Sequence, residues 1–132
     1  MHLYNNWCNN ATVIFVDAPP GTGFSKAGRN LDVVGNDYHY ANEATIFIKQ
    51  LFYDWFELRS NNIYISGNGY GGIFSALLAL NIHRLNKETK MHNRFYRLIN
   101  LKGVFVSNTI VDYKDGPSTF TIDMMYEYNL IP

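Results

Sequence analysis

A glycine-rich segment in the middle of the chain has the residue types of two kinds of functional site. Residues 67–72 read Gly-Asn-Gly-Tyr-Gly-Gly. Gly67, Gly69 and Gly72 match the G-x-G-x-x-G fingerprint, in which glycines let a backbone approach a dinucleotide pyrophosphate at a helix N-terminus. The segment also has the outline of a nucleophile elbow, G-x-S-x-G, whose middle residue is held in a strained conformation. A tight strand-to-helix connection without a site is the third interpretation.

Each of the two functional interpretations lacks one group that its chemistry needs. The dinucleotide fingerprint requires an acidic residue at the end of the next strand, about 20 residues further on. Glu88 has that spacing but lies in the polar run 86–93. The elbow requires a serine at its tip, where this chain has Gly69. From this segment alone, all three interpretations stay open.

A second loop, residues 18–25, resembles a phosphate-binding P-loop in part. Its sequence is Ala-Pro-Pro-Gly-Thr-Gly-Phe-Ser. The full pattern needs a glycine where Ala18 stands and a lysine where Phe24 stands, and the lysine is the group that reaches the phosphates. No helix is predicted directly after Ser25, so nucleotide binding is not favoured here.

Composition limits the classes of partner. The chain has 132 residues, of which 47% are hydrophobic and 17% charged, with 11 basic and 11 acidic side chains. This balance argues against a nucleic-acid surface or a polybasic membrane face. No apolar run reaches the roughly 18 residues of a membrane span, and the first residues do not have the pattern of a signal peptide. We therefore predict a globular domain with no nucleic-acid or membrane partner and no cofactor.

Several isolated residues have side chains that could serve as sites. Cys8 is the only cysteine, which excludes an internal disulfide, and a lone cysteine is most often a buried apolar residue. The four histidines have no partner at metal-ligand spacing. Asp17 and Asp112 follow predicted strands, so they either face the site edge or serve as turn residues or caps. Residues 10–12, Asn-Ala-Thr, form a glycosylation sequon next to a predicted strand.

The elements that must position these residues alternate between strand and helix. Asn62–Ser66 and Leu101–Ser107 are β-branched and apolar, and Thr12–Val16 is a continuous apolar run typical of a strand buried on both faces. Helices are predicted over residues 37–58, 73–85 and 121–129. This order predicts an α/β fold with a mainly parallel sheet of about three strands and flanking helices.

The two longer predicted helices have different patterns. In residues 37–58 the apolar side chains recur at helical spacing and predict a stripe that faces the core, with Asn36 or Asp37 as N-cap. Its members are Ala44, Phe47, Ile48, Leu51, Phe52, Trp55 and Phe56. Residues 73–85 are apolar nearly all round, which predicts a buried helix.

Four blocks of the chain, in order, resemble the serine carboxypeptidase family of α/β-hydrolases. Residues 10–25, NATVIFVDAPPGTGFS, are similar to the family's NVIFLDQPVGTGFS. Residues 61–72, NNIYISGNGYGG, are similar to NDFYITGESYAG. Residues 99–108, INLKGVFVSN, resemble INLKGIAIGN, and Asp112 then falls on the family's following aspartate. Residues 128–131, YNLI, resemble YHGLI.

The resemblance implies a fold, an activity and a compartment. The expected fold is a partial α/β-hydrolase, with residues 1–132 as one incomplete domain. Family members release C-terminal residues from peptides by Ser-His-Asp catalysis, so a peptide C-terminus is the implied partner. The implied compartment is secretory, lysosomal or vacuolar.

Departures from the family pattern fall at the elbow. Gly69 replaces the nucleophilic serine, and Asn68 replaces a glutamate that helps to bind the substrate carboxylate. Tyr70 falls on the residue whose backbone N–H belongs to the oxyanion hole, and Gly71 replaces an alanine. The family's catalytic aspartate and histidine and its WNGGPG loop fall outside residues 1–132. We therefore expect this chain to be inactive as it stands, with Ser66 and Ser75 as the nearest hydroxyls but neither at the tip.

The resemblance also predicts the order of strands. Asn62–Ser66 should pair directly with Leu101–Ser107, in parallel. One further family strand, upstream of residue 1, would separate Thr12–Val16 from Asn62–Ser66 by an empty lane about 10 Å wide. Such a gap leaves backbone groups unpaired and core exposed, so the isolated chain should be unstable or prone to aggregation.

Overall fold

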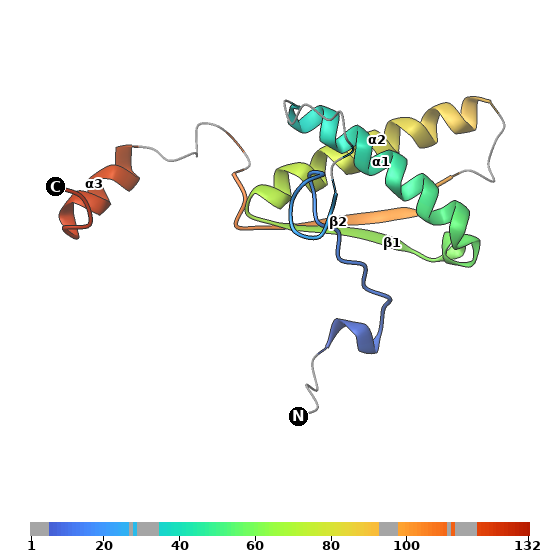
Figure 1. The fold of residues 1–132 in the computed structure, drawn as a ribbon, viewed down its shortest axis with the longest axis horizontal. Helices are drawn as coiled ribbons and strands as arrows, with labels where there is room; N and C mark the ends of the chain where they lie inside the picture. The colour runs from blue at the N-terminus through green and yellow to red at the C-terminus, as the bar shows by residue number, and fades with distance from the viewer. Residues whose placement is uncertain (1–5, 27, 29–34, 93–97, 111, 113–118) are drawn as a thin grey trace. The chain divides into compact units, whose positions relative to one another are not determined.

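The computed structural model describes residues 6–26, 28, 35–92, 98–110, 112 and 119–132. The chain divides into two compact units, Met1–Gly35 and Asn36–Pro132. The second unit contains both strands and the long helices (Figure 1). The expectation of one incomplete hydrolase domain stays a prediction.

The sheet of the second unit has two parallel strands, β1 (Ile63–Asn68) and β2 (Leu101–Ser107). Their register pairs Ile65 with Val104 and Asn68 with Ser107, and it shifts once, between Ile63 and Tyr64. This confirms the predicted parallel pair, with β1 running two residues beyond the expected Ser66. It also confirms an α/β arrangement, because long helices flank the parallel strands.

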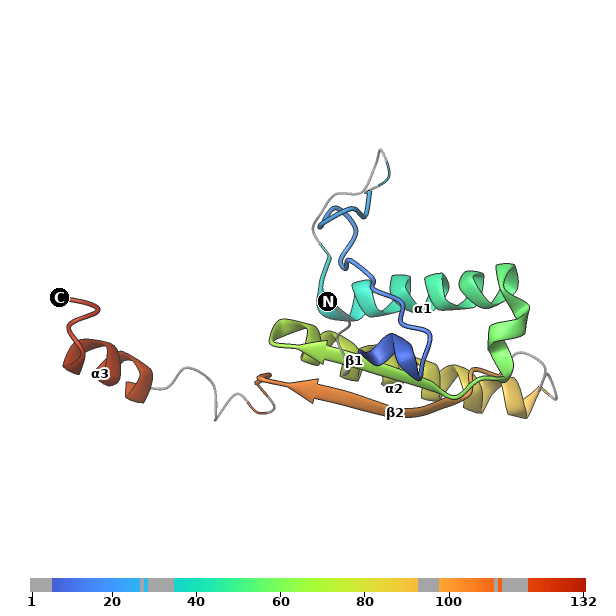
Figure 2. The same ribbon diagram turned by 90° about the horizontal axis from the view of Figure 1, so that it is seen from below.

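The helices α1 (Asp37–Asp54) and α2 (Tyr70–Met91) form the layer above the sheet. α2 packs on both strands, and α1 packs on α2 (Figure 1). Figure 2 shows the structure turned by 90° and seen from below, with the strands in front of α2. The buried core joins Phe52 of α1, Leu78 and Ile82 of α2, and Ile99 just before β2. Partly buried side chains extend it: Ala44, Ile48, Leu58, Ile63, Ile65, Leu85 and Leu101.

Helix α1 begins as predicted and ends earlier. The Asn36 side-chain oxygen accepts a hydrogen bond from the His39 N–H at 2.9 Å, which makes Asn36 the N-cap, and Asp37 lies in the first turn, where the helix dipole favours it. The helix stops at Asp54 rather than Leu58, and a short 3-10 helix, η2 (Phe56–Ser60), follows.

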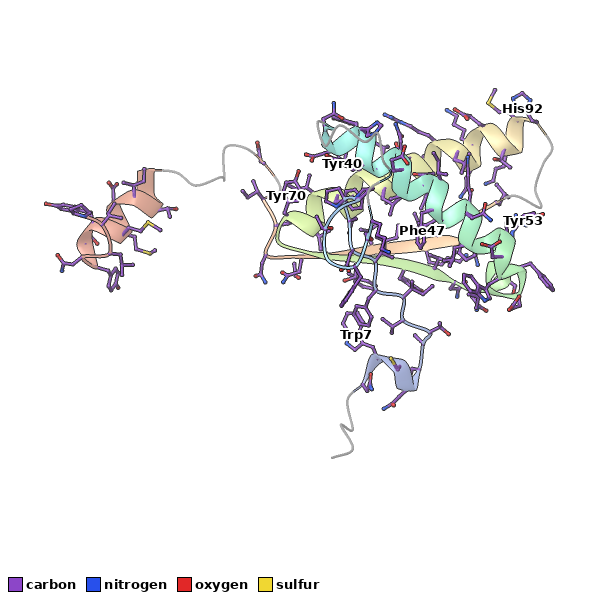
Figure 3. The ribbon with its side chains drawn as sticks, in the orientation of Figure 1. Trp7, Tyr40, Phe47, Tyr53, Tyr70 and His92 are labelled. Carbon is purple, nitrogen blue, oxygen red and sulfur yellow. The ribbon has the colours of Figure 1, made fainter. Side chains whose placement is uncertain are left out.

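The predicted apolar stripe of α1 is only partly core. Phe52 is buried, whereas Phe47 (Figure 3), Trp55 and Phe56 are exposed. The exposed fraction of Phe56 is 75%. The stripe assumed one straight helix, but the backbone leaves helical geometry at Trp55, with φ −120 and ψ 71. Since α1 packs against α2, only its facing residues, with Ala41 and Phe52 among them, lose contact with water.

Helix α2 is longer than predicted and less completely buried. It begins at Tyr70 rather than residue 73, and it extends beyond the predicted end at residue 85 into the polar run, as far as Met91. Its buried residues are Gly72, Ser75, Leu78, Ile82 and Thr89. Leu80, on another side of the helix, is 40% exposed. The prediction of a helix buried all round was therefore wrong, because only one stripe of α2 contacts the rest of the second unit.

The predicted strand Thr12–Val16 is not a strand in this structure. The segment has no regular secondary structure, and the sheet has the order β1–β2 only. A strand requires a hydrogen-bonded neighbour, and no described residue pairs with this run as a ladder. Phe15, expected to be buried, is 91% exposed. The sheet thus has two strands instead of about three, and the empty-lane geometry stays a prediction.

The remaining elements are short. Near the N-terminus lies a 3-10 helix, η1 (Trp7–Asn9), and near the C-terminus lies α3 (Thr119–Glu127), which begins and ends two residues before the predicted helix. The sequence also predicts a helix breaker at Gly116-Pro117 and a cap at Ser118 or Thr119; Gly116, Pro117 and Ser118 lie outside the described residues, and Thr119 is the first residue of α3. No helix in the described part of the chain is long and apolar enough to cross a membrane.

Candidate functional site

The turn between β1 and α2 consists of three consecutive residues with different roles. Asn68 is the last residue of β1, Gly69 makes the turn, and Tyr70 is the first residue of α2 (Figure 3 labels Tyr70). Gly69 has φ 58 and ψ −125, a conformation that side chains rarely adopt. Its N–H donates to the Ser107 carbonyl at 2.9 Å, which ties the turn to the end of β2.

The tip of this turn is open. A Cβ built on Gly69 would meet nothing within 4 Å, so a side chain there would project freely. A strained residue between a strand and a helix, with an unobstructed side chain, is the geometry that a nucleophile elbow requires. The roles of Asn68, Gly69 and Tyr70 in substrate binding, as nucleophile position and in the oxyanion hole stay predictions.

Two other glycines of the segment allow α2 to approach its neighbours closely. A Cβ on Gly67 would overlap the Gly71 carbonyl and the Ser75 hydroxyl. A Cβ on Gly72 would lie 2.6 Å from the Thr109 Cβ. Both distances are too short for real atoms, so these positions have no room for a side chain. Gly67 and Gly72 are thus explained by packing alone.

The same observations bear on the dinucleotide fingerprint. Its acidic residue should follow the second strand, beside the glycine turn. Glu88 instead lies in α2 itself and is exposed, and β2 ends in Ser107 followed by Asn108. Among the described residues, no acidic side chain occupies the position that would bind a ribose.

A cluster of polar side chains surrounds Asn68 at the carboxyl edge of the sheet. The Asn68 side-chain oxygen accepts from the Ser107 hydroxyl and from the Asn108 amide, each at 3.1 Å. Because the oxygen is occupied, the Asn68 Nδ2 group is left to donate. Sequence reasoning missed Ser107 and Asn108. The signal was available, since parallel strands end at the same edge.

A second link joins the starts of the two long helices. The Tyr70 hydroxyl donates to the Asp37 carboxylate, which connects the first turn of α2 to the first turn of α1. No sequence pattern indicates this pair, because Asp37 and Tyr70 are far apart in the chain. The two serines considered as substitutes lie elsewhere, Ser66 within β1 and Ser75 buried in α2.

The loop 17–25 in the first unit is closed by its own hydrogen bonds. The Asp17 carboxylate accepts from the Phe24 N–H at 2.8 Å, and the Ser25 hydroxyl donates to the Asp17 carbonyl at 2.6 Å. The Gly21 N–H donates to the Ser25 carbonyl at 3.1 Å. Asp17 is therefore a turn residue, and the N–H groups of Gly21 and Phe24 already have acceptors within the loop.

The other isolated residues do not assemble into a site. Cys8 is exposed, so its expected burial was wrong, because η1 leaves its side chains in solvent. His39, His83 and His92 are exposed on or beside the helices, and His2 lies outside the described residues. Asp112 is exposed. In the described ranges, no group of three His, Cys, Asp or Glu side chains could hold a metal.

Comparison with known proteins gives a consistent match. The family model described as serine carboxypeptidase matches residues 2–132. Serine carboxypeptidase-like 21 of Arabidopsis thaliana is 32% identical over 107 residues, which cover 81% of this chain and 21% of that protein. Serine carboxypeptidase 3 of Hordeum vulgare is 30% identical over 125 residues, which cover 95% of this chain and 23% of that protein. The chain thus spans about a fifth of the length of these curated relatives. It belongs to the serine carboxypeptidase family.

Proposed function

We propose that this chain is a catalytically inert serine carboxypeptidase-like protein. The observation that supports the proposal is Gly69 at the tip of the β1–α2 turn, where φ is 58. A family member needs a hydroxyl at this position to attack the scissile carbonyl. Glycine has no such group, and removal of the nucleophile in a serine protease lowers turnover by about 10⁶-fold.

Glycine at the tip keeps the shape of the turn. A residue with a side chain pays on the order of 1–3 kcal/mol for such a backbone conformation, and glycine does not. Glycine in place of the family's serine therefore retains the backbone of the turn and removes the hydroxyl that would attack the substrate carbonyl. Neither of the two serines nearest in sequence occupies the tip, because Ser75 is buried in α2 and Ser66 lies within β1, before the tip.

The direct test is hydrolysis of a blocked dipeptide at acidic pH. We expect no release of the C-terminal residue above a buffer blank, with an active serine carboxypeptidase as the positive control. Turnover that rises with protein concentration and survives repurification would overturn the proposal.

A restoration experiment tests the elbow geometry separately. In a protein that also contains the family's catalytic aspartate and histidine, Gly69→Ser should introduce labelling by a fluorophosphonate, because the tip is open and the serine then has its general base. Gly69→Ala is the matched control, since it has the same backbone strain and no hydroxyl. Equal labelling of the two variants would show that the tip is not a nucleophile position.

Retained binding of a peptide C-terminus is the second candidate function. Asn68 favours it, because its oxygen is held by Ser107 and Asn108 while Nδ2 remains a donor. An amide donor can bind a carboxylate without itself taking up a proton. The N–H of Tyr70, at the start of α2, is the second group that would contribute.

Calorimetry with paired peptides tests this binding. A peptide with a free C-terminal carboxylate should bind more tightly than the same peptide with a C-terminal amide. Asn68→Leu should remove the difference, because leucine has a similar size and no donor. Equal or absent binding of both peptides would leave the chain without a binding function at this turn.

A further inference from the structure

The glycosylation sequon at residues 10–12 is not part of the candidate site at the β1–α2 turn and has no role in the proposed function. Asn10-Ala11-Thr12 is the only Asn-x-Ser/Thr sequence in the 132 residues, and its middle residue is not proline. Its position beside a predicted strand argued against use, because a strand in the middle of a sheet would bury the acceptor. That strand does not form, so the objection no longer holds.

The local structure presents both essential side chains. Asn10 caps the C-terminal end of η1, and its backbone N–H donates to the Trp7 carbonyl at 3.2 Å. The side chains of Asn10 and Thr12 are exposed. Within the described part of the chain, the side-chain amide of Asn10 forms no hydrogen bond. The turn therefore places an uncommitted amide on the surface, two residues before an exposed hydroxyl.

We propose that Asn10 is an acceptor for N-linked glycan. The donor is an oligosaccharide on a polyprenyl diphosphate. A bond forms between the Asn10 Nδ2 atom and the anomeric carbon, and the bond from that carbon to the diphosphate oxygen breaks. The polyprenyl diphosphate leaves with the electron pair, and one amide proton passes to a base of the transferase. Thr12 supplies the hydroxyl that the transferase recognises.

A glycan at Asn10 has a physical consequence for the residues that follow. Ile14, Phe15 and Val16 are exposed apolar side chains. A bulky, hydrated oligosaccharide a few residues away would keep other chains from this run. Glycosylation should therefore raise the solubility of the protein.

Glycosylation of Asn10 requires that the chain enter the secretory lumen, which the family relationship implies. It does not depend on the proposed loss of catalysis at Gly69 or on peptide binding at Asn68. The test is expression of the chain behind a cleavable leader in a eukaryotic host. Total protein, soluble and insoluble, is treated with peptide N-glycosidase F. We expect one downward shift in mobility, and aspartate in place of Asn10 in the released peptide.

Four variants assign the shift to this sequon. Asn10→Gln and Thr12→Ala should abolish it. Thr12→Ser should keep it, because serine also provides the hydroxyl. Asn9→Gln is the matched control, since Asn9 is adjacent but is not part of a sequon, and it should keep the shift.

Because the mobility shift is measured on total protein, a variant that folds poorly still shows whether it has been glycosylated. Leader-cleaved chain that shows no shift would overturn the inference while leaving the proposal for Gly69 intact. A shift that persists in Asn10→Gln would place the modification on another residue and would also overturn it.

Discussion

Gly67, Gly69 and Gly71 lie at or beside the β1–α2 turn, and a Cβ would have different surroundings at each of them. Gly67 lies against the backbone of α2 and has no space for a Cβ. Gly69 has space but a positive φ of 58. Gly71 has space and lies inside α2, so nothing in the described structure requires glycine there.

Substitution of these glycines by alanine should therefore have opposite effects. Gly67→Ala should destabilise the fold by about 1–3 kcal/mol or more, because its Cβ overlaps the Gly71 carbonyl and neither backbone can yield easily. Urea unfolding followed by circular dichroism measures the change as a lower midpoint.

Gly71→Ala is the control for that experiment. Inside a helix, alanine is more stable than glycine by about 0.5–1 kcal/mol. The midpoint should thus rise, or at least not fall. If both variants lowered the midpoint by the same amount, the close approach of β1 to α2 at Gly67 would be wrong.

At the scale of elements, Asn86 joins the last part of α2 to the start of β2. Its amide donates to the Ile99 carbonyl at 2.8 Å, and its oxygen accepts from the Ile99 N–H at 2.9 Å. Ile99 is buried in the core. The side chain thus completes the backbone hydrogen bonds of a buried residue that precedes the strand.

Asn86→Ala should cost about 1–3 kcal/mol, because it leaves the buried Ile99 N–H without a partner and removes one of the two donors to the Ile99 carbonyl, the other being the Leu101 N–H at 2.8 Å. Asn86→Asp is the graded control, since a carboxylate still accepts from the N–H but cannot donate to the carbonyl. We expect unfolding midpoints in the order Asn, Asp, Ala. Hydrogen exchange of the Ile99 amide should accelerate most in the alanine variant, and unchanged exchange would contradict the assignment.

The N-cap of α1 gives a second prediction at this scale. Asn36→Ala should destabilise the fold by about 1 kcal/mol, because the His39 N–H loses its acceptor. Asn36→Ser should retain most of the stability, since serine is an equally good cap. Thermal unfolding by circular dichroism distinguishes the two, and equal midpoints for alanine and serine would exclude a capping role.

At the scale of the whole molecule, much apolar surface remains in contact with water. Phe15 and Phe24 are exposed in the first unit. In the second unit, Tyr64 and Phe105 lie side by side on the sheet, with ring centroids 5.7 Å apart, and both are more than half exposed. Exposed strands and aromatic patches of this kind favour association.

We therefore predict that the isolated chain aggregates, and that Phe15→Lys together with Phe105→Lys reduces aggregation. Light scattering against protein concentration is the measurement. Since both side chains are largely exposed, the free energy of unfolding should change by only about 0.5 kcal/mol at each site.

Ala11→Lys together with Ala76→Lys controls for charge, because this pair also adds two lysines at exposed positions and removes no aromatic ring. It should leave the scattering closer to that of the unmodified chain than the phenylalanine double variant does. Equal improvement by the alanine double variant would show that net charge, and not exposed apolar surface, governs association.

Short stretches of the sequence predict most of the local elements of the second unit, and several such stretches together identify the family. Leu101–Ser107 is the strand predicted, the cap Asn36 begins α1, and the strand and helix beside Gly69 follow from hydrophobic pattern and breakers. Four motif blocks in order identified the family, which the comparisons confirm. These features depend on residues close together in the chain, so short windows of sequence contain them.

The sequence pattern does not show which apolar residues form the core or which polar side chains satisfy its backbone groups; the folded structure shows both. Thr12–Val16 has the pattern of a buried strand, but a strand needs a neighbour, and pattern alone does not supply one. Asn86 lies just beyond the predicted end of the helix at residue 85, yet the helix continues to Met91 and Asn86 forms two hydrogen bonds with Ile99. The polar cluster of Asn68, Ser107 and Asn108 likewise exists only because two parallel strands end together. Burial and hydrogen bonding between distant segments depend on which surfaces meet, and that is a property of the folded chain.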